Sequence, residues 1–222
     1  MVTSNDTGVK MPEAAKRTYR SDLRDEQARA TRRRIVTAGG DLFVERGYAA
    51  TTVDAIAERA GVSRKTVFNS VGGKPALLKL AWDWALVGDD EPVPMADRPE
   101  IRAIMAEKDP DTLVSRWARF DAAIGARLAD LYPVLLIAAD GDPEVAALNQ
   151  ESERNRRNGA RWLVDQLAGI GGLRPDLSRE RATDVIATLM DPVPYRRLVH
   201  DAGWTFDEYA DHLERMVIAA LR

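Results

Sequence analysis

The run from Thr51 to Lys74 is the part of the sequence that most constrains the fold. Two short segments with helical spacing of their apolar residues flank Gly61, which can adopt the left-handed conformation that ends a helix. Ser63 follows shortly after, where its hydroxyl is well placed to cap a second helix. The pattern predicts two short helices joined by a tight glycine turn, as in a helix-turn-helix.

The first of these helices has two candidate caps. Thr51 or Thr52 can accept a hydrogen bond from a backbone N–H of the first turn. Thr51 with Asp54 resembles a capping box that uses Asp in place of the usual Glu or Gln. Ile56 and Ala57 are expected to face inward, and the small Ala57 allows a second helix to cross closely.

The second helix, predicted over residues 64–71, carries apolar side chains four residues apart. Val67 and Val71 form its buried side, which leaves a polar and basic set for the other faces: Arg64, Lys65, Thr66, Phe68, Asn69 and Ser70. Arg can pair bidentately with guanine and Asn with adenine, while Lys and Arg also bind phosphates. This face predicts a helix that enters the major groove of DNA. The alternative is a solvated polar face on an ordinary three-helix core.

A longer helix is predicted before this run, over residues 27–46. Its apolar residues fall at helical spacing, and Gly47 supplies a C-terminal stop. Gly39 and Gly40 lie inside it, although each costs roughly 1 kcal/mol relative to Ala in a helix. Close backbone packing against a neighbouring helix is the expected reason for them.

The rest of the chain is expected to divide around these helices. Residues 1–26 show no apolar period and are predicted to form a flexible basic arm, or a solvated tail of little consequence. In the first case the following side chains can reach DNA: Lys16, Arg17, Arg20 and Arg24. Residues 27–73 are expected to form the helix-turn-helix domain. From Lys74 to the end the periods are helical throughout, which predicts an all-α chain.

Charge is distributed unevenly along the chain. Residues 1–80 hold 15 Lys and Arg against 9 Asp and Glu, whereas residues 81–222 hold 17 against 26, so the two parts carry net charges of +6 and −9. A basic N-terminal part on an acidic body can approach nucleic acid through one end only.

Several classes of protein are excluded or disfavoured by composition. There is no cysteine, which excludes disulfides, thiolate catalysis and cysteine zinc sites. The first thirty residues lack an apolar signal region, and the longest apolar run, Pro133–Ala139, is too short to span a bilayer. The expected location is the cytoplasm.

The segment from Thr31 to Leu80, and above all the run from Thr51 to Lys74, resembles the DNA-binding domain of TetR-type (tetracycline-repressor family) transcriptional regulators. The resemblance implies an all-α homodimer that binds a DNA operator, with residues 74–222 forming a helical regulatory and dimerisation domain. It also implies a small-molecule effector that shifts the fourth helix and releases the DNA.

The family pattern makes residues 64–70 the recognition helix. It implies base-edge or phosphate contacts for Arg64, Lys65, Thr66 and Asn69, with Phe68 and Ser70 on the same helix, and phosphate contacts for Thr52 and Lys74. The family usually has Tyr where Phe68 stands, and an aromatic-rich ending such as His-Phe is common where this chain has Ser70 to Gly73. Phe68 therefore lacks a phosphate-bonding hydroxyl, although its ring can contact a thymine methyl.

A mostly apolar effector pocket is implied in the helical body. Its candidate lining is Trp82, Met105, Trp117, Phe120, Leu136, Asn149, Glu153 and Trp162. Asp121 and Glu153 are candidates to orient a cationic ligand. The alternative is that the aromatic residues and Met fill the core and the charged residues are solvated.

The resemblance also implies dimerisation through the last two long helices, over residues 179–190 and 206–221. The apolar residues that can form this interface, or fill the core of one subunit instead, are Val185, Ile186, Leu189, Tyr209, Leu213, Met216, Val217 and Leu221.

The main alternative class is an enzyme, and the sequence contains little that supports it. Glu208 and His212 lie four apart on a predicted helix, as two metal ligands can, but no third ligand is near them in sequence. No P-loop or serine-nucleophile motif occurs, and Gly169–Gly172 lacks the spacing of a dinucleotide fingerprint. We therefore expect no metal, no cofactor and no enzymatic activity. The alternatives are an architectural DNA-binding protein without an effector and a helical enzyme with an unrecognised site.

Overall fold

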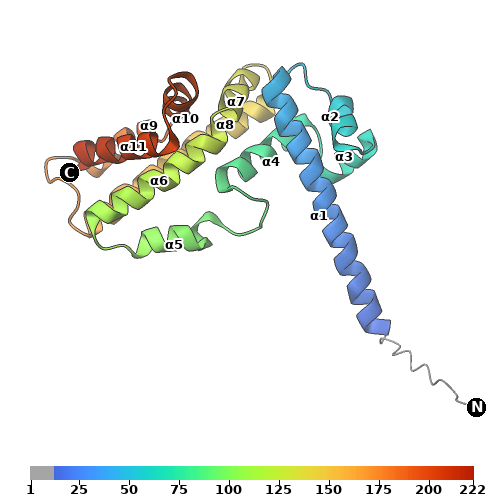
Figure 1. Cartoon of the computed structure of the whole chain (residues 1–222), viewed down its shortest axis with the longest axis horizontal. Coiled ribbons are helices and arrows are strands. Elements are labelled where there is room, and N and C mark those ends of the chain that lie inside the picture. The colour runs from blue at the N-terminus through green and yellow to red at the C-terminus, as the bar shows by residue number, and fades with distance from the viewer. Residues whose placement is uncertain (1–12) are drawn as a thin grey trace, which may run out of the picture.

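The computed structural model describes residues 13–222, and the side chains from residue 24 onward. The described residues contain helices and loops but no strand, which confirms the all-α class (Figure 1). The helices are α1 Glu13–Arg46, α2 Val53–Ala60, α3 Arg64–Val71, α4 Lys74–Val87, α5 Pro99–Ala106, α6 Pro110–Leu128, α7 Leu131–Ala139, α8 Pro143–Gly169, α9 Arg179–Leu189, α10 Pro192–Tyr195 and α11 Phe206–Leu221, with a 3-10 turn η1 Met95–Asp97 and a π-helical segment η2 Arg196–Asp201.

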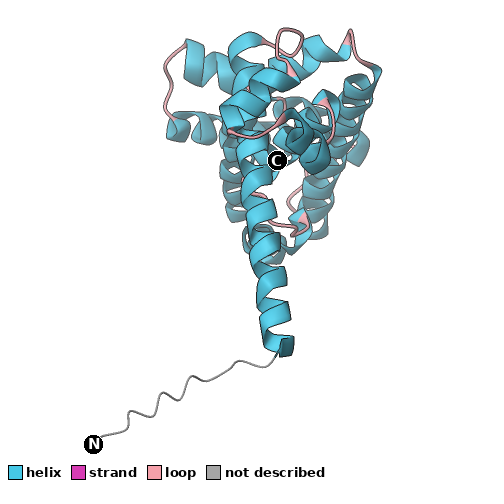
Figure 2. Ribbon diagram, turned by 90° about the vertical axis from the view of Figure 1, so that its right-hand side faces the viewer, coloured by secondary structure: helices cyan, strands magenta, loops and turns pink. Residues whose placement is uncertain are grey.

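Helices α1, α2 and α3 form one end of the molecule, and α6, α8, α9 and α11 form the body (Figure 1). Helix α4 lies between them and contacts α1, α6 and α8. The N-terminal half of α1 extends away from the body as a rod (Figures 1 and 2).

Helix α1 begins at Glu13, not at Gln27 as predicted. Residues 13–26 contain neither Gly nor Pro and consist largely of good helix formers. Their helix propensity therefore supports a helix, although their apolar residues do not recur at helical spacing. Of the basic residues assigned to the arm, Arg24 is exposed on this helix, whereas the side chains of Lys16, Arg17 and Arg20 lie outside the described part. Residues 1–12 of the predicted arm also lie outside it.

The turn between α1 and α2 is held by a buried threonine. Thr51 is almost fully buried and its hydroxyl donates to the carbonyl oxygens of Leu42 and Gly47, at 3.0 and 2.8 Å. The cap of α2 is Thr52, whose hydroxyl accepts from the N–H of Ala55 at 3.1 Å. The predicted Thr51–Asp54 capping box is therefore wrong, because the Thr51 hydroxyl is used inside the turn.

The turn between α2 and α3 has the predicted form. Gly61 adopts the left-handed conformation with φ of 65°, and the hydroxyl of Ser63 accepts from the N–H of Thr66 at 3.1 Å. Val67 and Val71 are buried against α1 and α2, as expected.

Gly39 allows α4 to pack closely on α1. A Cβ at Gly39 would lie 2.1 Å from Cδ2 of Leu77, which confirms close packing as the reason for this glycine. A Cβ at Gly40 would lie 3.7 Å from Cβ of Ala81, an ordinary contact. The packing of α4 on α1 therefore requires a glycine at position 39 but not at position 40.

The described residues form two hydrophobic cores, and the first continues from the helix-turn-helix into α4 and the body. The first core joins α1, α2, α3 and α4 to α7 and the start of α8, and the second fills the space between α5, α6, α8, α9 and α11. Leu77 and Leu78 of α4 belong to the same core as Ile35 and Phe43 of α1. The helix-turn-helix is thus packed directly on the body.

The C-terminal half follows its predicted caps. Asp142 caps α8, Ser178 caps α9, and Thr205 with Glu208 forms a capping box for α11. Among residues 13–222, no single helix is long and apolar enough to cross a membrane; α6 and α7 reach that length and composition only as a pair bent by 63°.

Candidate nucleic-acid interface and buried cavity

Helix α3 presents the outer face that was expected to read DNA. Arg64, Lys65, Phe68 and Asn69 are exposed, and Thr66 and Ser70 are half-buried. The hydroxyl of Thr66 lies 2.8 Å from that of Ser63, so it also takes part in the helix cap. The side chains that are free to reach a base edge from this helix are chiefly Lys65 and Asn69.

Arg64 is shared between two neighbours. Its guanidinium donates to Asp54 of α2 at 2.9 Å and lies 5.6 Å from the centroid of the exposed Phe68 ring. An exposed ion pair of this kind is worth less than about 1 kcal/mol, so a phosphate or a guanine can replace Asp54 at little cost. The arrangement keeps Arg64 beside the exposed face of α3.

Lys74 points back into the protein. Its ammonium donates to the carbonyl oxygen of Tyr48 at 2.6 Å and lies 4.3 Å from the centroid of the Tyr48 ring. Burial lowers the pKa of Lys74 below its ordinary value. Lys74 therefore links the start of α4 to the turn after α1. A phosphate would have to bind the ammonium while its bond to Tyr48 persists, or replace that bond. Thr52, at the start of α2, is exposed.

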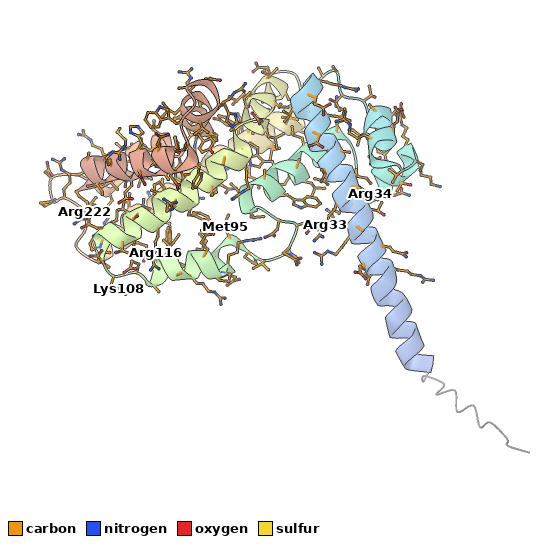
Figure 3. The ribbon with its side chains drawn as sticks, in the orientation of Figure 1. Arg33, Arg34, Met95, Lys108, Arg116 and Arg222 are labelled. Carbon is orange, nitrogen blue, oxygen red and sulfur yellow. The ribbon has the colours of Figure 1, made fainter. Side chains whose placement is uncertain are left out.

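Two arginines of α1 are held by an acidic loop after α4. Arg29 pairs with Glu91 at 2.9 Å, and Arg33 pairs with Asp90. Figure 3 shows Arg33 projecting from α1 toward this loop, and Arg34 is exposed beside it. Within the described part, no acid lies within ion-pair distance of Arg34, which leaves its charge available to DNA.

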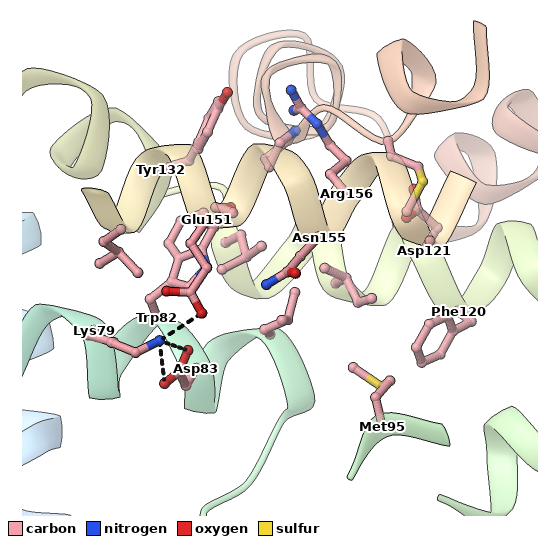
Figure 4. A pocket seen from close by; sticks show the side chains of 18 residues that line it. Lys79, Trp82, Asp83, Met95, Phe120, Asp121, Tyr132, Glu151, Asn155 and Arg156 are labelled. Atoms are coloured by element: carbon pink, nitrogen blue, oxygen red, sulfur yellow. Dashed lines mark hydrogen bonds and ion pairs between the residues drawn. The ribbon is translucent and has the colours of Figure 1, made fainter. Parts of the chain in front are cut away.

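A cavity of about 340 Å³ lies between α4, α6 and α8 (Figure 4). Most of its walls are apolar. It is lined by Lys79, Trp82, Asp83, Leu86, Met95, Phe120, Asp121, Ile124, Leu128, Tyr132, Leu148, Glu151, Ser152, Asn155, Arg156, Gly159, Met190 and Pro192.

The charged residues of the cavity fall into two groups. At one end the half-exposed Lys79 lies 3.4 Å from Asp83 and 3.5 Å from Glu151 (Figure 4). At the other end Arg156 donates to Asp191 at 2.7 Å and also pairs with Glu153. Both cations of the lining are therefore already paired with carboxylates.

Asp121 differs from the other acids of the cavity. It lies on α6 with only 6% of its surface exposed, and among the described residues it has neither a hydrogen-bond donor nor an ion-pair partner. Burial raises the pKa of Asp121 to about 7, against the opposing effect of the Arg156 charge. This carboxyl is the one buried acid in the described part that faces a cavity without a partner.

The structure brings three of the predicted pocket residues together, Trp82, Phe120 and Asp121. The others lie elsewhere. Trp117 and Trp162 pack in or against the second core, and Met105 and Leu136 are exposed on α5 and α7. Asn149 and Glu153 do not line the cavity because both lie on α8 beyond the edge of the helix face that the lining residues share.

Sequence reasoning missed much of the wall that α8 supplies. Leu148, Ser152, Asn155, Arg156 and Gly159 recur at spacings of three and four and therefore share one face. The sequence marks this face only by the polar stretch of residues 149–158 inside a long helix, a pattern that fits a solvated surface equally well.

The residues predicted for the dimer interface divide into two sets. Ile186, Tyr209, Leu213, Val217 and Leu221 are buried in the second core, so for them the alternative of core packing holds. Val185 and Met216 are 39% and 42% exposed on α9 and α11, and Leu189 is half-buried. Only these three leave apolar surface for a partner.

A helix-turn-helix with an exposed polar second helix, packed on a helical body that holds a cavity, defines a DNA-binding transcription regulator. Comparison with known proteins gives the family. Residues 35–81 match the family model for bacterial regulatory proteins of the tetR family. The uncharacterised HTH-type transcriptional regulator YdeS of Bacillus subtilis (strain 168) is 30% identical over 196 residues, which cover 88% of each chain. The chain therefore belongs to the TetR family.

Solved structures share the fold. FadR of Bacillus subtilis, in complex with stearoyl-CoA, superposes with a TM-score of 0.64 at 14% identity, over 85% of this chain and 98% of that one. NalD of Pseudomonas aeruginosa, the secondary repressor of the MexAB-OprM multidrug efflux pump, superposes with a TM-score of 0.61 at 18% identity, over 86% and 96%. These proteins are regulators, not enzymes.

Proposed function

We propose that the protein is a homodimeric, sequence-specific repressor in the cytoplasm, which leaves its operator when a small molecule fills the cavity between α4, α6 and α8. The observation that supports this most is the double role of α4. Trp82 and Leu86 line the cavity, whereas Leu77 of the same helix packs on Gly39 of α1. A ligand that moves α4 therefore moves the surface on which the helix-turn-helix rests.

Recognition of DNA is assigned to α3. Lys65 and Asn69 contact base edges in the major groove, and Arg64 exchanges Asp54 for a guanine or a phosphate. Thr66 and Ser70 lie at the margin of this contact, and the Phe68 ring meets a thymine methyl. Thr52, Lys74 and the exposed Arg34 bind phosphates, which gives an affinity that depends on salt.

Dimerisation is assigned to the outer face of α9 and α11, through Val185, Leu189 and Met216. Two copies joined there present two α3 helices to successive major grooves, about 34 Å apart or a multiple of it. Because α3 is rigidly packed, a small rotation of each helix-turn-helix is enough to break this match.

Ligand control is supported by the fold and by the cavity. The FadR neighbour binds stearoyl-CoA in a structure of the same fold, and about 340 Å³ lies within the range of small-molecule sites. An architectural DNA-binding protein has no use for such a cavity beside the helix that carries its DNA-binding unit.

The test of DNA recognition is a selection of duplexes bound by the full-length protein from a random library. We expect a pseudo-palindrome, bound roughly a thousandfold more tightly than random duplex at physiological salt. Equal binding of selected and random duplexes would contradict a sequence-specific repressor.

The dimer is tested by sedimentation of two matched variants. Met216→Lys is expected to give a monomer that loses affinity for the full palindrome. Ile137→Lys is the control, because Ile137 is 76% exposed on α7, away from the assigned interface. A dimer that survives Met216→Lys but not Ile137→Lys would move the interface to α7.

A further inference from the structure

We infer that the cavity takes an amphiphilic organic cation, whose apolar body lies between α4, α6 and α8 and whose protonated amine pairs with the carboxylate of Asp121. The inference rests on the proposed function, in which this cavity is the effector site. It names the chemical class of that effector.

Asp121 provides the first argument. A carboxylate that loses its water without gaining a partner is costly, and such groups in proteins are normally paired. Asp121 is buried and faces the cavity, yet no donor from the described residues reaches it. Arg156 is near enough to influence it but donates to Asp191 and Glu153 instead. A ligand ammonium supplies the missing charge and the missing hydrogen bonds.

The balance of charge in the lining provides the second argument. Its three acids are Asp83, Asp121 and Glu151, and its two cations are Lys79 and Arg156. Because both cations are engaged by carboxylates, an anionic ligand would have to break an existing pair. A cationic ligand breaks none, since Asp121 is unpaired among the described residues.

The walls define the remainder of the ligand. Trp82, Phe120, Ile124 and Leu128 supply apolar wall, and Met95 adds to it from the segment after α4. Figure 4 shows Asp121 on the far side of the cavity from Lys79 and Asp83. An unbranched or aromatic apolar body fits this lining, with its charged group beside Asp121.

The experiment compares three probes with one chain and three head groups: decylamine, decanol and decanoate. Each is titrated by calorimetry into the full-length protein, below the concentration at which it aggregates. We expect decylamine to bind about tenfold or more tightly than decanol, and decanoate most weakly. Tightest binding of decanoate, or no binding of any probe, would overturn the inference.

Variants then locate the amine. Asp121→Asn keeps the shape of the side chain, and in it decylamine is expected to bind within about twofold of decanol. Asp83→Asn and Glu151→Gln are the matched controls at the half-exposed end, and each is expected to retain the preference for the amine. If the preference survives Asp121→Asn and disappears in either control, the ammonium lies at the other end and the assignment to Asp121 is wrong.

A measurement on the unmodified protein does not depend on the folding of any variant. A primary amine stays protonated at pH values well below 10. Asp121 faces the charge of Arg156 from α8 and the hydroxyl of Tyr209 from α11, and the raised pKa of Tyr209 keeps it neutral. The preference for decylamine over decanol should therefore grow about tenfold or more between pH 5.5 and 8.5. A preference that shrinks would indicate that protonated Asp121 donates to its ligand, and would overturn the inference.

Failure of the proposed function can be distinguished from failure of the ligand class by adding the selected duplex to the binding experiments. If decylamine binds through Asp121 but leaves the selected duplex bound, the ligand class stands and ligand-controlled release does not. If another small molecule releases the duplex while decylamine shows no preference for Asp121, release stands and the ligand class does not.

Discussion

The hydroxyl of Tyr48 donates to Oδ2 of Asp142 at 2.8 Å, across 94 residues of sequence. Tyr48 lies in the turn after α1, and the other oxygen of Asp142 caps α8 by accepting from the N–H groups of Glu144 and Val145. Burial and the Asp142 charge raise the pKa of Tyr48 above its ordinary value, so the hydroxyl remains a donor. One carboxylate thus joins the DNA-binding end to the helix that supplies much of the cavity wall.

Tyr48→Phe is predicted to weaken this connection without emptying the core. The lost bond to a charged group lowers the free energy of unfolding by about 1–3 kcal/mol, measured by urea denaturation. Operator affinity is expected to fall several-fold, because the helix-turn-helix is less firmly held on α8. Tyr132→Phe is the matched control: its hydroxyl donates to Asp191 at 3.2 Å within the body. Equal losses of operator affinity in both variants would show that the Tyr48 bond has no special part in positioning the DNA-binding end.

Gly39→Ala is predicted to destabilise the protein by about 1–3 kcal/mol, since a methyl there overlaps the buried Leu77 side chain. Gly40→Ala tests the same change one residue along. There the methyl meets only an ordinary contact, and the higher helix propensity of Ala is expected to raise stability by up to about 1 kcal/mol. Thermal unfolding of the two variants measures the difference. Equal stabilities would mean that Leu77 moves aside freely.

Asn69→Ala and Lys74→Ala are predicted to affect DNA binding in different ways. Loss of the Asn69 amide should cost roughly 1–3 kcal/mol at particular base pairs and relax the preference there. Loss of the Lys74 charge should weaken binding to all duplexes alike and reduce the slope of log affinity against log salt by about 1. Binding at several salt concentrations to selected and altered duplexes distinguishes the two. An unchanged salt slope in Lys74→Ala would assign Lys74 solely to its bond with Tyr48.

The helix-turn-helix could be predicted from sequence because local interactions determine it. Gly61 needs a left-handed conformation and Ser63 caps the next helix, and both effects act within a few residues. The predicted capping role of Thr51 fails because its acceptors, the carbonyl oxygens of Leu42 and Gly47, come together only when the turn has formed. Sequence spacing alone does not contain that geometry.

The cavity was harder to predict because its lining depends on how the helices are rotated against one another. Trp82 and Trp117 are both buried aromatic residues on predicted helices, yet Trp82 lines the cavity and Trp117 does not. Arg156 was hidden in a polar stretch that reads as a solvated surface. Arg156 lines the cavity because α8 packs this face against α4 and α6, an orientation that the sequence does not specify.

The pH dependence of stability tests the environment of Asp121 without a ligand. The folded protein raises the pKa of Asp121 from an ordinary 3.8 to about 7. Below pH about 4 the group is protonated in both states. Between pH about 4 and 7 only the folded state holds the proton, so the free energy of unfolding falls as the pH rises, and above 7 the loss is complete. The total loss is on the order of 4 kcal/mol at most, with relaxation of the site reducing it.

Asp121→Asn removes this titration and leaves all other groups in place. The difference in unfolding free energy between the variant and the unmodified protein is therefore predicted to move in favour of the variant from pH 4 to pH 8. Urea denaturation at several pH values measures it, and contributions from the other carboxylates cancel in the difference. Arg156 and Tyr209, the charged and polar groups nearest to Asp121, do not change protonation in this range because their pKa values lie above it. A difference that stays constant with pH would show that Asp121 is solvated or paired in the folded protein, and it would remove the electrostatic reason for a cationic ligand.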